Sequence, residues 1–584
     1  MRFNARVTST GAWTAALLTA TVACLALAQT PGAPPLPSGG PELGPDVRVF
    51  DPSMPKEAVQ DAVDAVFRRQ ERAQFGTGRQ ALLFKPGTYD VDVDTGFYTQ
   101  VAGLGLSPDD VTIRGAVRAE ADWFGGNATQ NFWRAAENLS VTPASGADRW
   151  AVSQAAPYRR MHLRGDLRLD DGGWSSGGLI ADSLIDGTVR SGTQQQWLSR
   201  DSEFGGWTGA IWNMVFVGVR NAPPGAFPRP PHTRVDRTPV MREKPFLHVD
   251  RAGAYRVFVP ALRTGGRGTT WAHGARPAGT SRPLGRFFVV RPGTGAARID
   301  AALARGKDLL FTPGIHHLDR TLRVTRPGTV VLGLGLATLV PDTGRTALSV
   351  ADVDGVRIAG LLVDAGPAGS PALMEIGPPD ARRRHSADPV SLHDVFFRIG
   401  GAGAGRATRS LVVNSSDVIG DNLWLWRADH GDGIGWTVNT AAEGLVVNGD
   451  RVTMYGLFVE HYQRHQTLWN GEGGRTYFFQ NEMPYDPPGQ AAWRSGAAQG
   501  YPAYKVAAGV TRHEAWGMGS YCSFDADPDI VADRAFEAPR RPGVRFHDLV
   551  TVSLGGKGTI RHVINGTGGP ADARSGVAQV VSYP

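Results

Sequence analysis

Cysteine is almost absent from this chain of 584 residues, which contains only two. Cys24 lies in an apolar N-terminal segment, so Cys522 alone remains for the folded protein. The mature protein therefore has no internal disulfide, and a cysteine-based metal site is excluded. Its stability must come from a buried core, and the length and the 41% hydrophobic content are sufficient for one very large domain or two ordinary ones.

Lysine and long apolar runs are also scarce. The chain has six lysines against 55 arginines, which are spread along it, and the net charge of +6 is small for this length. We find no clustered basic patch of the kind that binds nucleic acid. Beyond the N-terminus no segment is apolar enough to span a bilayer. We therefore expect neither a nucleic-acid partner nor a membrane span.

The N-terminus has the features of an export signal. Arg2 and Arg6 precede the mostly apolar segment Ala12–Ala28, which ends in an A-x-A cleavage pattern. These features predict a signal peptide over residues 1–28, a Pro/Gly-rich linker over 29–44, and a secreted, extracellular protein. Acylation of Cys24, as in a lipoprotein, is the alternative.

A duplicated framework follows the linker. The stretch Leu82–Tyr89 recurs as Leu309–His316, 227 residues later, with a Pro-Gly turn in each copy. A Gly-Leu-Gly-Leu segment follows both copies, and short helices are predicted before them, at residues 56–69 and 296–305. We infer two homologous domains, at residues 45–262 and 284–584. A Gly/Arg/Thr-rich linker without helical or strand periodicity joins them at residues 263–283.

Finer repeats within the domains predict the fold. Leu411–Asn414 recurs as Leu445–Asn448, at an offset of 34, and Asp182-Ser183 recurs as Asp201-Ser202, at an offset of 19. Short apolar runs alternate with Gly/Asn/Asp turns throughout. Repeats of this size favour a solenoid in which each coil stacks on the next at about 4.8 Å. The predicted fold class is all-β: two tandem right-handed parallel β-helices, side by side with a cleft between them.

A strand, Pro-Gly-Thr-Tyr turn and Gly-Leu-Gly segment behind a short helix resembles the start of pectate-lyase-superfamily β-helices. Two such modules resemble glycoside hydrolase family 55, the β-1,3-glucanases, which place the active site between two β-helices. Glu460-His461 and Gln480-Asn481-Glu482-Met483-Pro484-Tyr485 match that family's motif. The resemblance implies that Glu482 is the general acid, with Glu460 one coil below. It also implies that polar residues of Thr193–Ser199 hold the attacking water.

The spacing of the two glutamates suggests how they work. Glu460 and Glu482 are 22 residues apart, so on successive coils their carboxylates would lie about 4.8 Å apart. An inverting acid and base need about 6.5–9.5 Å. The pair instead suits a protonated acid whose pKa is raised by an anionic neighbour, with the water held across the cleft by Gln195 or Ser199. An outward glutamate is also, more simply, a solvated side chain.

Further candidates surround this motif. The predicted substrate-binding residues are Trp426, Trp469, Gln480, Tyr485, His461 and Asp429. Tryptophans stack on sugars, although any single one more often packs in a core. Asp429 belongs to Asp-His-Gly-Asp-Gly, which suits a base, a calcium site or a turn.

These observations favour a secreted glycoside hydrolase that cleaves a β-1,3-glucan or related glycan by an inverting, acid-catalysed mechanism. We expect a polysaccharide substrate, a monomer, no metal and no cofactor. Two alternatives stay open. A calcium-dependent polysaccharide lyase would use the same scaffold, and so would a non-catalytic glycan-binding β-helix.

Overall fold

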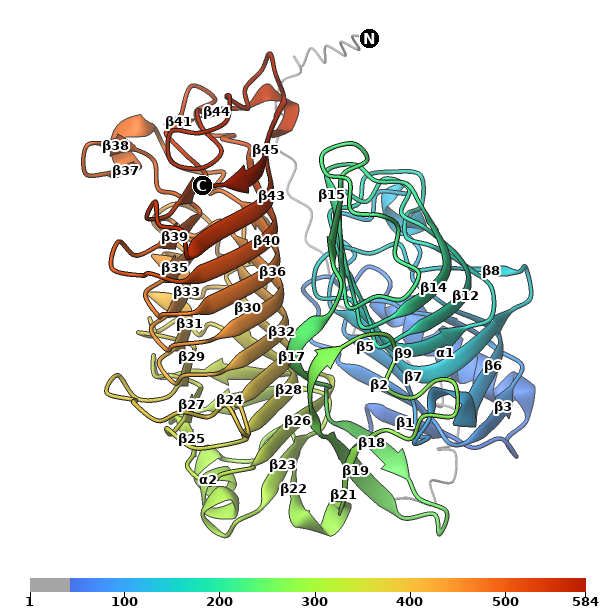
Figure 1. Cartoon of the computed structure of the whole chain (residues 1–584). Coiled ribbons are helices and arrows are strands. Elements are labelled where there is room, and N and C mark those ends of the chain that lie inside the picture. The colour runs from blue at the N-terminus through green and yellow to red at the C-terminus, as the bar shows by residue number, and fades with distance from the viewer. Residues whose placement is uncertain (1–42) are drawn as a thin grey trace, which may run out of the picture. The chain divides into compact units, whose positions relative to one another are not determined.

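The computed structural model describes residues 43–584, and most of its regular structure is parallel β-strand (Figure 1). The predicted signal peptide and most of the predicted N-terminal linker lie outside the described residues. Within them, two parallel β-helices follow one another along the chain and lie side by side (Figure 1). The prediction of two tandem right-handed β-helices is confirmed. No helix within residues 43–584 is long and apolar enough to cross a membrane.

The first β-helix is built on one 16-stranded sheet whose strands follow the coils in chain order. The strands on the side of the second β-helix are β1 (Val47–Phe50), β2 (Gln80–Phe84), β5 (Thr99–Gly103), β7 (Arg134–Pro143), β9 (Pro157–Leu163), β11 (Leu179–Ala181), β13 (Gln196–Arg200), β15 (Asn213–Val217) and β16 (His232–Val235). The outer strands are β3 (Gly87–Tyr89), β4 (Asp92–Asp94), β6 (Val111–Arg118), β8 (Ala147–Arg149), β10 (Asp166–Arg168), β12 (Leu184–Arg190) and β14 (Glu203–Thr208).

The second β-helix has a 12-stranded sheet toward the first and an 8-stranded sheet away from it. The 12-stranded sheet contains β22 (Phe287–Val290), β23 (Asp308–Phe311), β24 (Ile315–Leu318), β26 (Val330–Pro341), β28 (Arg357–Asp364), β30 (Ser391–Ile399), β32 (Ile419–Arg427), β34 (Thr453–Glu460), β36 (Gly474–Glu482), β40 (His513–Cys522), β43 (Val544–Ser553) and β45 (Val577–Tyr583). The 8-stranded sheet contains β25 (Leu322–Val324), β27 (Leu348–Val350), β29 (Met374–Ile376), β31 (Arg409–Val413), β33 (Glu443–Val447), β35 (Thr467–Trp469), β39 (Tyr504–Val506) and β42 (Phe536–Glu537).

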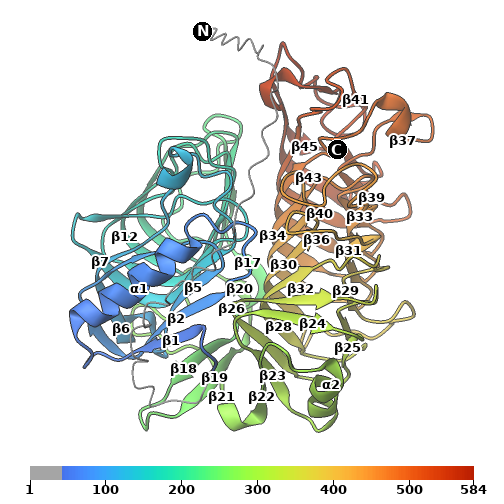
Figure 2. The same ribbon diagram turned by 180° about the vertical axis from the view of Figure 1, so that it is seen from behind.

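One α-helix stands near the start of each β-helix, as the repeat predicted. These are α1 (Lys56–Gln70) and α2 (Ala296–Ala304), both visible in Figure 2. The apolar face of α1, with Val59 and Val63, packs into the core of the first β-helix. Ile299 of α2 does the same in the second. Each helix thus covers apolar side chains of the opening coils, which have no preceding coil to bury them.

The segment that joins the two β-helices differs from the prediction. Residues 263–283 were expected to lack strands, but they contain most of β20 (Leu262–Gly266) and all of β21 (Gly279–Pro283). Two small antiparallel sheets form here, β17 (Thr238–Arg242) with β20, and β18 (Phe246–Val249) with β19 (Tyr255–Pro260) and β21. Long-range pairing with earlier strands gives this stretch a structure that its local composition does not show.

The 19-residue repeat of the first β-helix marks a backbone position. Asp182 and Asp201, one coil apart, both adopt left-handed backbone conformations, with φ of 48° and 47°. Aspartate tolerates this region better than most residues, which explains why the repeat is visible in the sequence. The second β-helix uses the same device at Asn422 and Phe478, with φ of 61° and 71°. Asp182 and Asp201 directly follow β11 and β13, whereas Asn422 and Phe478 lie inside β32 and β36.

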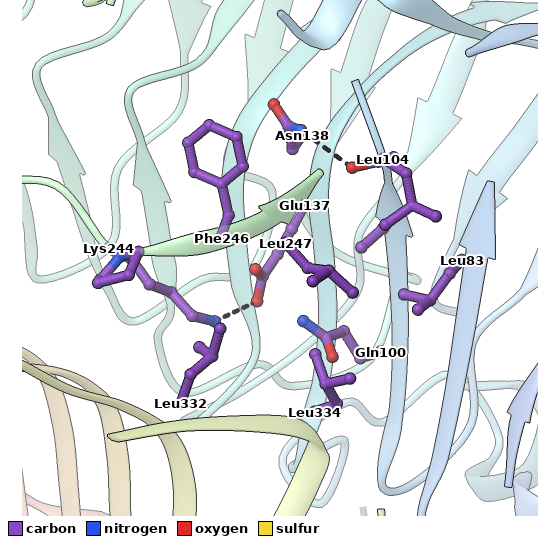
Figure 3. Close-up of a pocket in the computed structure, with 13 residues that line it drawn as sticks. Leu83, Gln100, Leu104, Glu137, Asn138, Lys244, Phe246, Leu247, Leu332 and Leu334 are labelled. Atoms are coloured by element: carbon purple, nitrogen blue, oxygen red, sulfur yellow. Dashed lines mark hydrogen bonds and ion pairs between the residues drawn. The ribbon is translucent and has the colours of Figure 1, made fainter. Parts of the chain in front are cut away.

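Buried charges join the two β-helices. The Asp421 carboxylate of the second accepts hydrogen bonds from Arg159 at 2.7 Å and from Arg200 at 3.1 Å, both from the first. Glu243, in the connecting segment, contacts Arg200 at 2.7 Å. All four side chains are at most 4% exposed. Figure 3 shows a neighbouring part of the interface, where the Lys244 ammonium binds the carboxylate of Glu137. These charged side chains therefore pair with one another across the interface.

Candidate active site

A pocket with about 680 Å³ of empty space opens between the two β-helices. Three of its residues lie at the C-terminal ends of consecutive interface strands of the second β-helix. Trp426 is the penultimate residue of β32, and Glu460 and Glu482 are the last residues of β34 and β36. Each is the direct ladder partner of the next. The prediction that the two glutamates are neighbours on successive coils is therefore confirmed in the strand register.

Strand alternation explains why these side chains reach the pocket. Val459 and Phe479 point into the core of the second β-helix. The residue after Val459 is Glu460, which therefore points outward, toward the first β-helix. Glu482 has the same orientation one coil further along, because the two are in register. Glu460 is 3% exposed, whereas the side chain of Glu482 is 16% exposed and is the more accessible to a ligand.

Glu460 is held from both β-helices. The Trp424 indole N–H donates to its Oε2 at 2.8 Å. The amide of Gln154, from the first β-helix, donates to its Oε1 at 2.8 Å. Burial, followed by the nearby carboxylate of Glu482, raises the pKa of Glu460 well above its usual value. A pair of this kind resists double ionisation and retains a proton near neutral pH.

Glu482 has different neighbours. Burial raises its pKa, but the charge of His461 and a hydrogen bond from the Tyr485 hydroxyl oppose this shift. His461 Nε2 lies 3.7 Å from Glu482 Oε2. Glu482 is therefore partly exposed to the pocket, and its pKa is raised less than burial alone would raise it. Such a group suits a general acid that must give and regain a proton.

His461 is fixed between two carboxylates. Its Nδ1 lies 3.1 Å from the carbonyl oxygen of Met483, so Nδ1 carries a proton. Its Nε2 faces Asp429 Oδ1, at 3.7 Å, as well as Glu482. Burial alone would raise the pKa of Asp429, but the charge of His461 and a hydrogen bond with His430 lower it to about 2. Asp429 is therefore an anion at neutral pH.

The first β-helix supplies uncharged polar groups to the opposite wall. Gln154, Ser176 and Gln195 lie on successive coils and all line the pocket. The Ser176 hydroxyl contacts Gln154 Oε1 at 3.3 Å, and Gln154 in turn holds Glu460. Gln195 lies just before β13 and is 8% exposed. The carboxylates of the pocket thus come from one β-helix, and the facing amides and hydroxyl come from the other.

Aromatic rings form another part of the wall. Trp426 stacks on Trp424 at 5.1 Å between ring centroids and lies parallel to Phe75 at 6.3 Å. Trp426 is 1% exposed and Phe132 is 5% exposed, and both line the pocket. Within residues 43–584, no group of three or more His, Cys, Asp or Glu side chains could hold a metal ion.

Comparisons with known proteins show the family of this chain. The family model of the LAM55 pectate lyase-like domain matches residues 287–482, which run from β22 to Glu482. An exo-beta-1,3-glucanase from Streptomyces sp. (strain SirexAA-E / ActE) is 57% identical over 550 residues, which is 94% of this chain and 90% of the relative. The chain belongs to glycoside hydrolase family 55. The solved structure of sacteLam55A, from Streptomyces sp. SirexAA-E, matches this family 55 member with a TM-score of 0.92 and 57% identity, over 94% of this chain and 100% of that one.

A second solved structure is an alanine variant of a glutamate of sacteLam55A, in complex with glucose. It matches with the same TM-score and identity, over 94% of this chain and 99% of that one. At 57% identity and near-complete coverage, the β-helix arrangement of this family 55 member is that of its relatives.

Three predicted site residues lie outside the pocket of this family 55 protein. Ser199 is fully buried, and its ladder partners Ile180 and Phe216 belong to the core of the first β-helix. Trp469 is fully buried in the core of the second β-helix and therefore cannot stack on a sugar. Gln480 is fully buried between the β-helices, where its amide donates to the carbonyl oxygen of Ser176. These three assignments to the pocket are corrected: Ser199 and Trp469 are core residues and Gln480 supports the wall.

Several residues in or behind the pocket were not predicted from the sequence. Ser176 lies 19 residues before Gln195, so the coil offset already visible at Asp182 and Asp201 could have found it. Gln154 and Trp424, which hold Glu460, follow no motif. Of the predicted residues, the structure brings together Glu482, Glu460, Gln195, Trp426, Tyr485, His461 and Asp429.

Proposed function

We propose that this protein hydrolyses β-1,3-glucan from a chain end, with Glu482 as the general acid. The observation that carries the proposal is the position of Glu482, which is partly exposed in a pocket, hydrogen-bonded by Tyr485 and opposite a wall of uncharged polar groups. The glucan substrate and the exo mode are supported by the name of the 57% identical relative.

The proposed reaction inverts the anomeric carbon. Glu482 donates its proton to the leaving oxygen as the C1–O bond breaks, and a water molecule attacks C1 from the other face. The proton that this water loses passes to solvent, from which the Glu482 carboxylate regains a proton. Gln195 and Ser176 lie on the wall of the first β-helix and are suited to hold that water. Asp429, Glu460 and Glu482 are the carboxylates that line the pocket, and all three belong to the second β-helix. The pocket therefore supports an acid on one side and a positioned water on the other.

Replacing the acid tests this assignment. Glu482→Gln keeps the size of the side chain but removes its proton, and should lower kcat on a soluble β-1,3-glucan by about 10²–10⁴-fold. Glu375→Gln, on the 8-stranded sheet, is the matched control and should leave kcat unchanged. Both variants should unfold at the same temperature as the wild-type protein, which shows that a loss of activity is not a loss of folding. Wild-type activity of a folded Glu482→Gln variant would rule out this acid, and initial release of the β-anomer would rule out inversion.

We also propose that the protein is exported, with cleavage after residue 28. The basic start, the apolar segment and the A-x-A pattern support this, and a polymeric glucan is a substrate that an enzyme meets outside the cell.

A further inference from the structure

Three arginine side chains surround an open hollow formed by the end of the first β-helix and the connecting segment. The hollow has about 700 Å³ of empty space. The residues of the described chain that line it are Arg220, Asn221, Arg237 and Arg267, and all four are exposed. None of these lining residues is acidic, so the hollow presents positive charge and supplies no counterion of its own.

Strand pairing places two of these arginines across from each other. β17 and β20 are antiparallel, and Thr238 is the partner of Gly266. Arg237 directly precedes Thr238 and Arg267 directly follows Gly266, so the two arginines lie opposite each other just beyond the end of this ladder. Like charges in such positions destabilise a sheet. Within residues 43–584 neither arginine forms an ion pair with an acidic side chain, and this uncompensated repulsion favours an anion as ligand.

The third arginine reaches the hollow from the neighbouring coil. Arg220 follows β15 and forms a parallel bridge with Glu203. Its Nη1 lies 3.5 Å from Glu203 Oε1. The same carboxylate also accepts a hydrogen bond from the Thr269 hydroxyl at 3.2 Å and lies 2.8 Å from His273 Nε2. The charge of Glu203 is therefore shared, and it neutralises Arg220 only in part.

The loops that carry the arginines are fastened to one another. The Gly268 N–H donates to the carbonyl oxygen of Gly218 at 2.7 Å, and Arg237 Nη1 donates to that of Gly265 at 3.0 Å. Arg220 packs over Gly268, where a Cβ atom would lie 2.7 Å from the Arg220 Nε. Gly268 also has a φ of 69°, which glycine adopts without strain. Loops held in this way lose little conformational entropy when a ligand binds.

The hollow is separate from the active-site pocket. Gln195 lines the pocket and lies directly before β13, at the N-terminal end of that strand. Arg220 lies beyond the C-terminal end of β15, which is the parallel neighbour of β13. A strand of five residues spans about 16 Å, so the two sites lie at opposite ends of these interface strands. A neutral glucan in the pocket would leave the arginines without a counterion.

We propose that Arg220, Arg237 and Arg267 form a binding site for a phosphate group. Guanidinium groups from three loops suit the several oxygens that a phosphate presents in different directions, whereas a carboxylate has two oxygens in one plane. A phosphate monoester also carries a charge of about −1.5 to −2 near neutral pH, which suits more than one uncompensated guanidinium group. The phosphate can be inorganic or carried by a polysaccharide, because the hollow is open to both. This inference goes beyond the proposed function and does not depend on it.

Calorimetric titration of the purified protein tests the proposal. The ligands are phosphorylated dextran, carboxymethyl dextran of the same charge density, unmodified dextran and inorganic phosphate. We expect phosphorylated dextran to bind more tightly than carboxymethyl dextran, inorganic phosphate to compete with it, and unmodified dextran not to bind. Arg267→Gln should raise the Kd for phosphorylated dextran about 5-fold, the upper range for one exposed ion pair. A double variant with Arg237→Gln and Arg267→Gln should abolish saturable binding.

Two controls separate this site from net charge and from catalysis. Arg323→Gln removes the same charge from an exposed arginine of the 8-stranded sheet and should leave the Kd unchanged. Hydrolysis of laminaribiose, which consists of two β-1,3-linked glucosyl units, should be unchanged in every variant. A failure of this proposal is therefore distinguishable from a failure of the proposed function. Without ligand, Arg267→Gln should unfold at or above the wild-type temperature, because it relieves the repulsion from Arg237.

The opposing outcomes are distinct. Equal weakening by Arg323→Gln and Arg267→Gln would overturn the proposal, since net charge alone would then explain binding. Equal affinity for the phosphorylated and the carboxymethylated polymer would overturn the assignment to phosphate. Saturable binding of inorganic phosphate alone, lost in the double variant, would support the site and identify its ligand as the free ion. Binding of neither phosphate ligand would refute the site.

Discussion

The charge on His461 should set the alkaline limit of activity. We expect His461→Asn to move the basic limb of the pH profile of kcat/KM to higher pH. His461 Nε2 lies 3.7 Å from Glu482 Oε2, and the cation favours the ionised form of Glu482 and so lowers its pKa. Without the cation, Glu482 keeps its proton to higher pH. Asparagine retains an N–H that can donate to the carbonyl oxygen of Met483, as His461 Nδ1 does.

The distance gives the size of the shift. Two unit charges 3.7 Å apart interact by about 1 kcal/mol at the dielectric constant of water and by about 4.5 kcal/mol at an effective value of about 20. Since about 1.4 kcal/mol corresponds to one pH unit, the limb should move by about one unit or more. Asp429 also raises the pKa of Glu482, but it does so in both proteins and therefore does not change the size of the shift.

The assay is the initial rate of glucose release from laminaribiose across the acid and neutral range. Glu460→Gln provides a control. Burial and the neighbouring carboxylate of Glu482 raise the pKa of Glu460 well above its usual value, so Glu482 ionises first, while Glu460 is still neutral. Replacing Glu460 with glutamine therefore removes no charge, and the basic limb should stay in place. A limb that stays in place, or moves to lower pH, in a folded His461→Asn variant would refute the reasoning.

Two further predictions concern the interface and the N-terminus. Asp421→Asn should lower the free energy of unfolding by about 3–5 kcal/mol, because it leaves the buried Arg159 and Arg200 without their shared carboxylate; denaturant unfolding at constant m-value measures this, and a loss below about 1 kcal/mol would contradict it. N-terminal sequencing of protein from the culture medium should begin at Gln29, whereas a lipid-modified Cys24 would support the lipoprotein alternative.

Most of the fold could be predicted from the local repeats in the sequence. The spacing between Glu460 and Glu482 equals one coil, so their pairing in register followed from the chain alone. The two residues that hold Glu460, Gln154 and Trp424, depend on how the β-helices dock and on which sheet faces the cleft. A coil repeat is a property within one β-helix and contains no information about that docking.

The errors at Ser199 and Trp469 have simple physical origins. Gln195 lies before β13, so it is not part of the alternation that begins at Gln196. From there Trp197 and Ser199 point inward, although Gln195 reaches the pocket. Trp469 lies on β35, in the sheet away from the cleft. Closeness in sequence to the acidic residues did not indicate which sheet carries it.

The strand register that places Glu482 beside Glu460 also limits how this site can change. Deletion of one residue within β36 would turn the side chain of Glu482 toward the core. It would also bring Asn481, which is buried in the intact protein, to the outer face. Insertions are tolerated in the turns, where they leave the order of coils intact. Between the turns, the cleft can lengthen only by whole coils of about 4.8 Å. The reach of the enzyme along its substrate is therefore set in discrete steps.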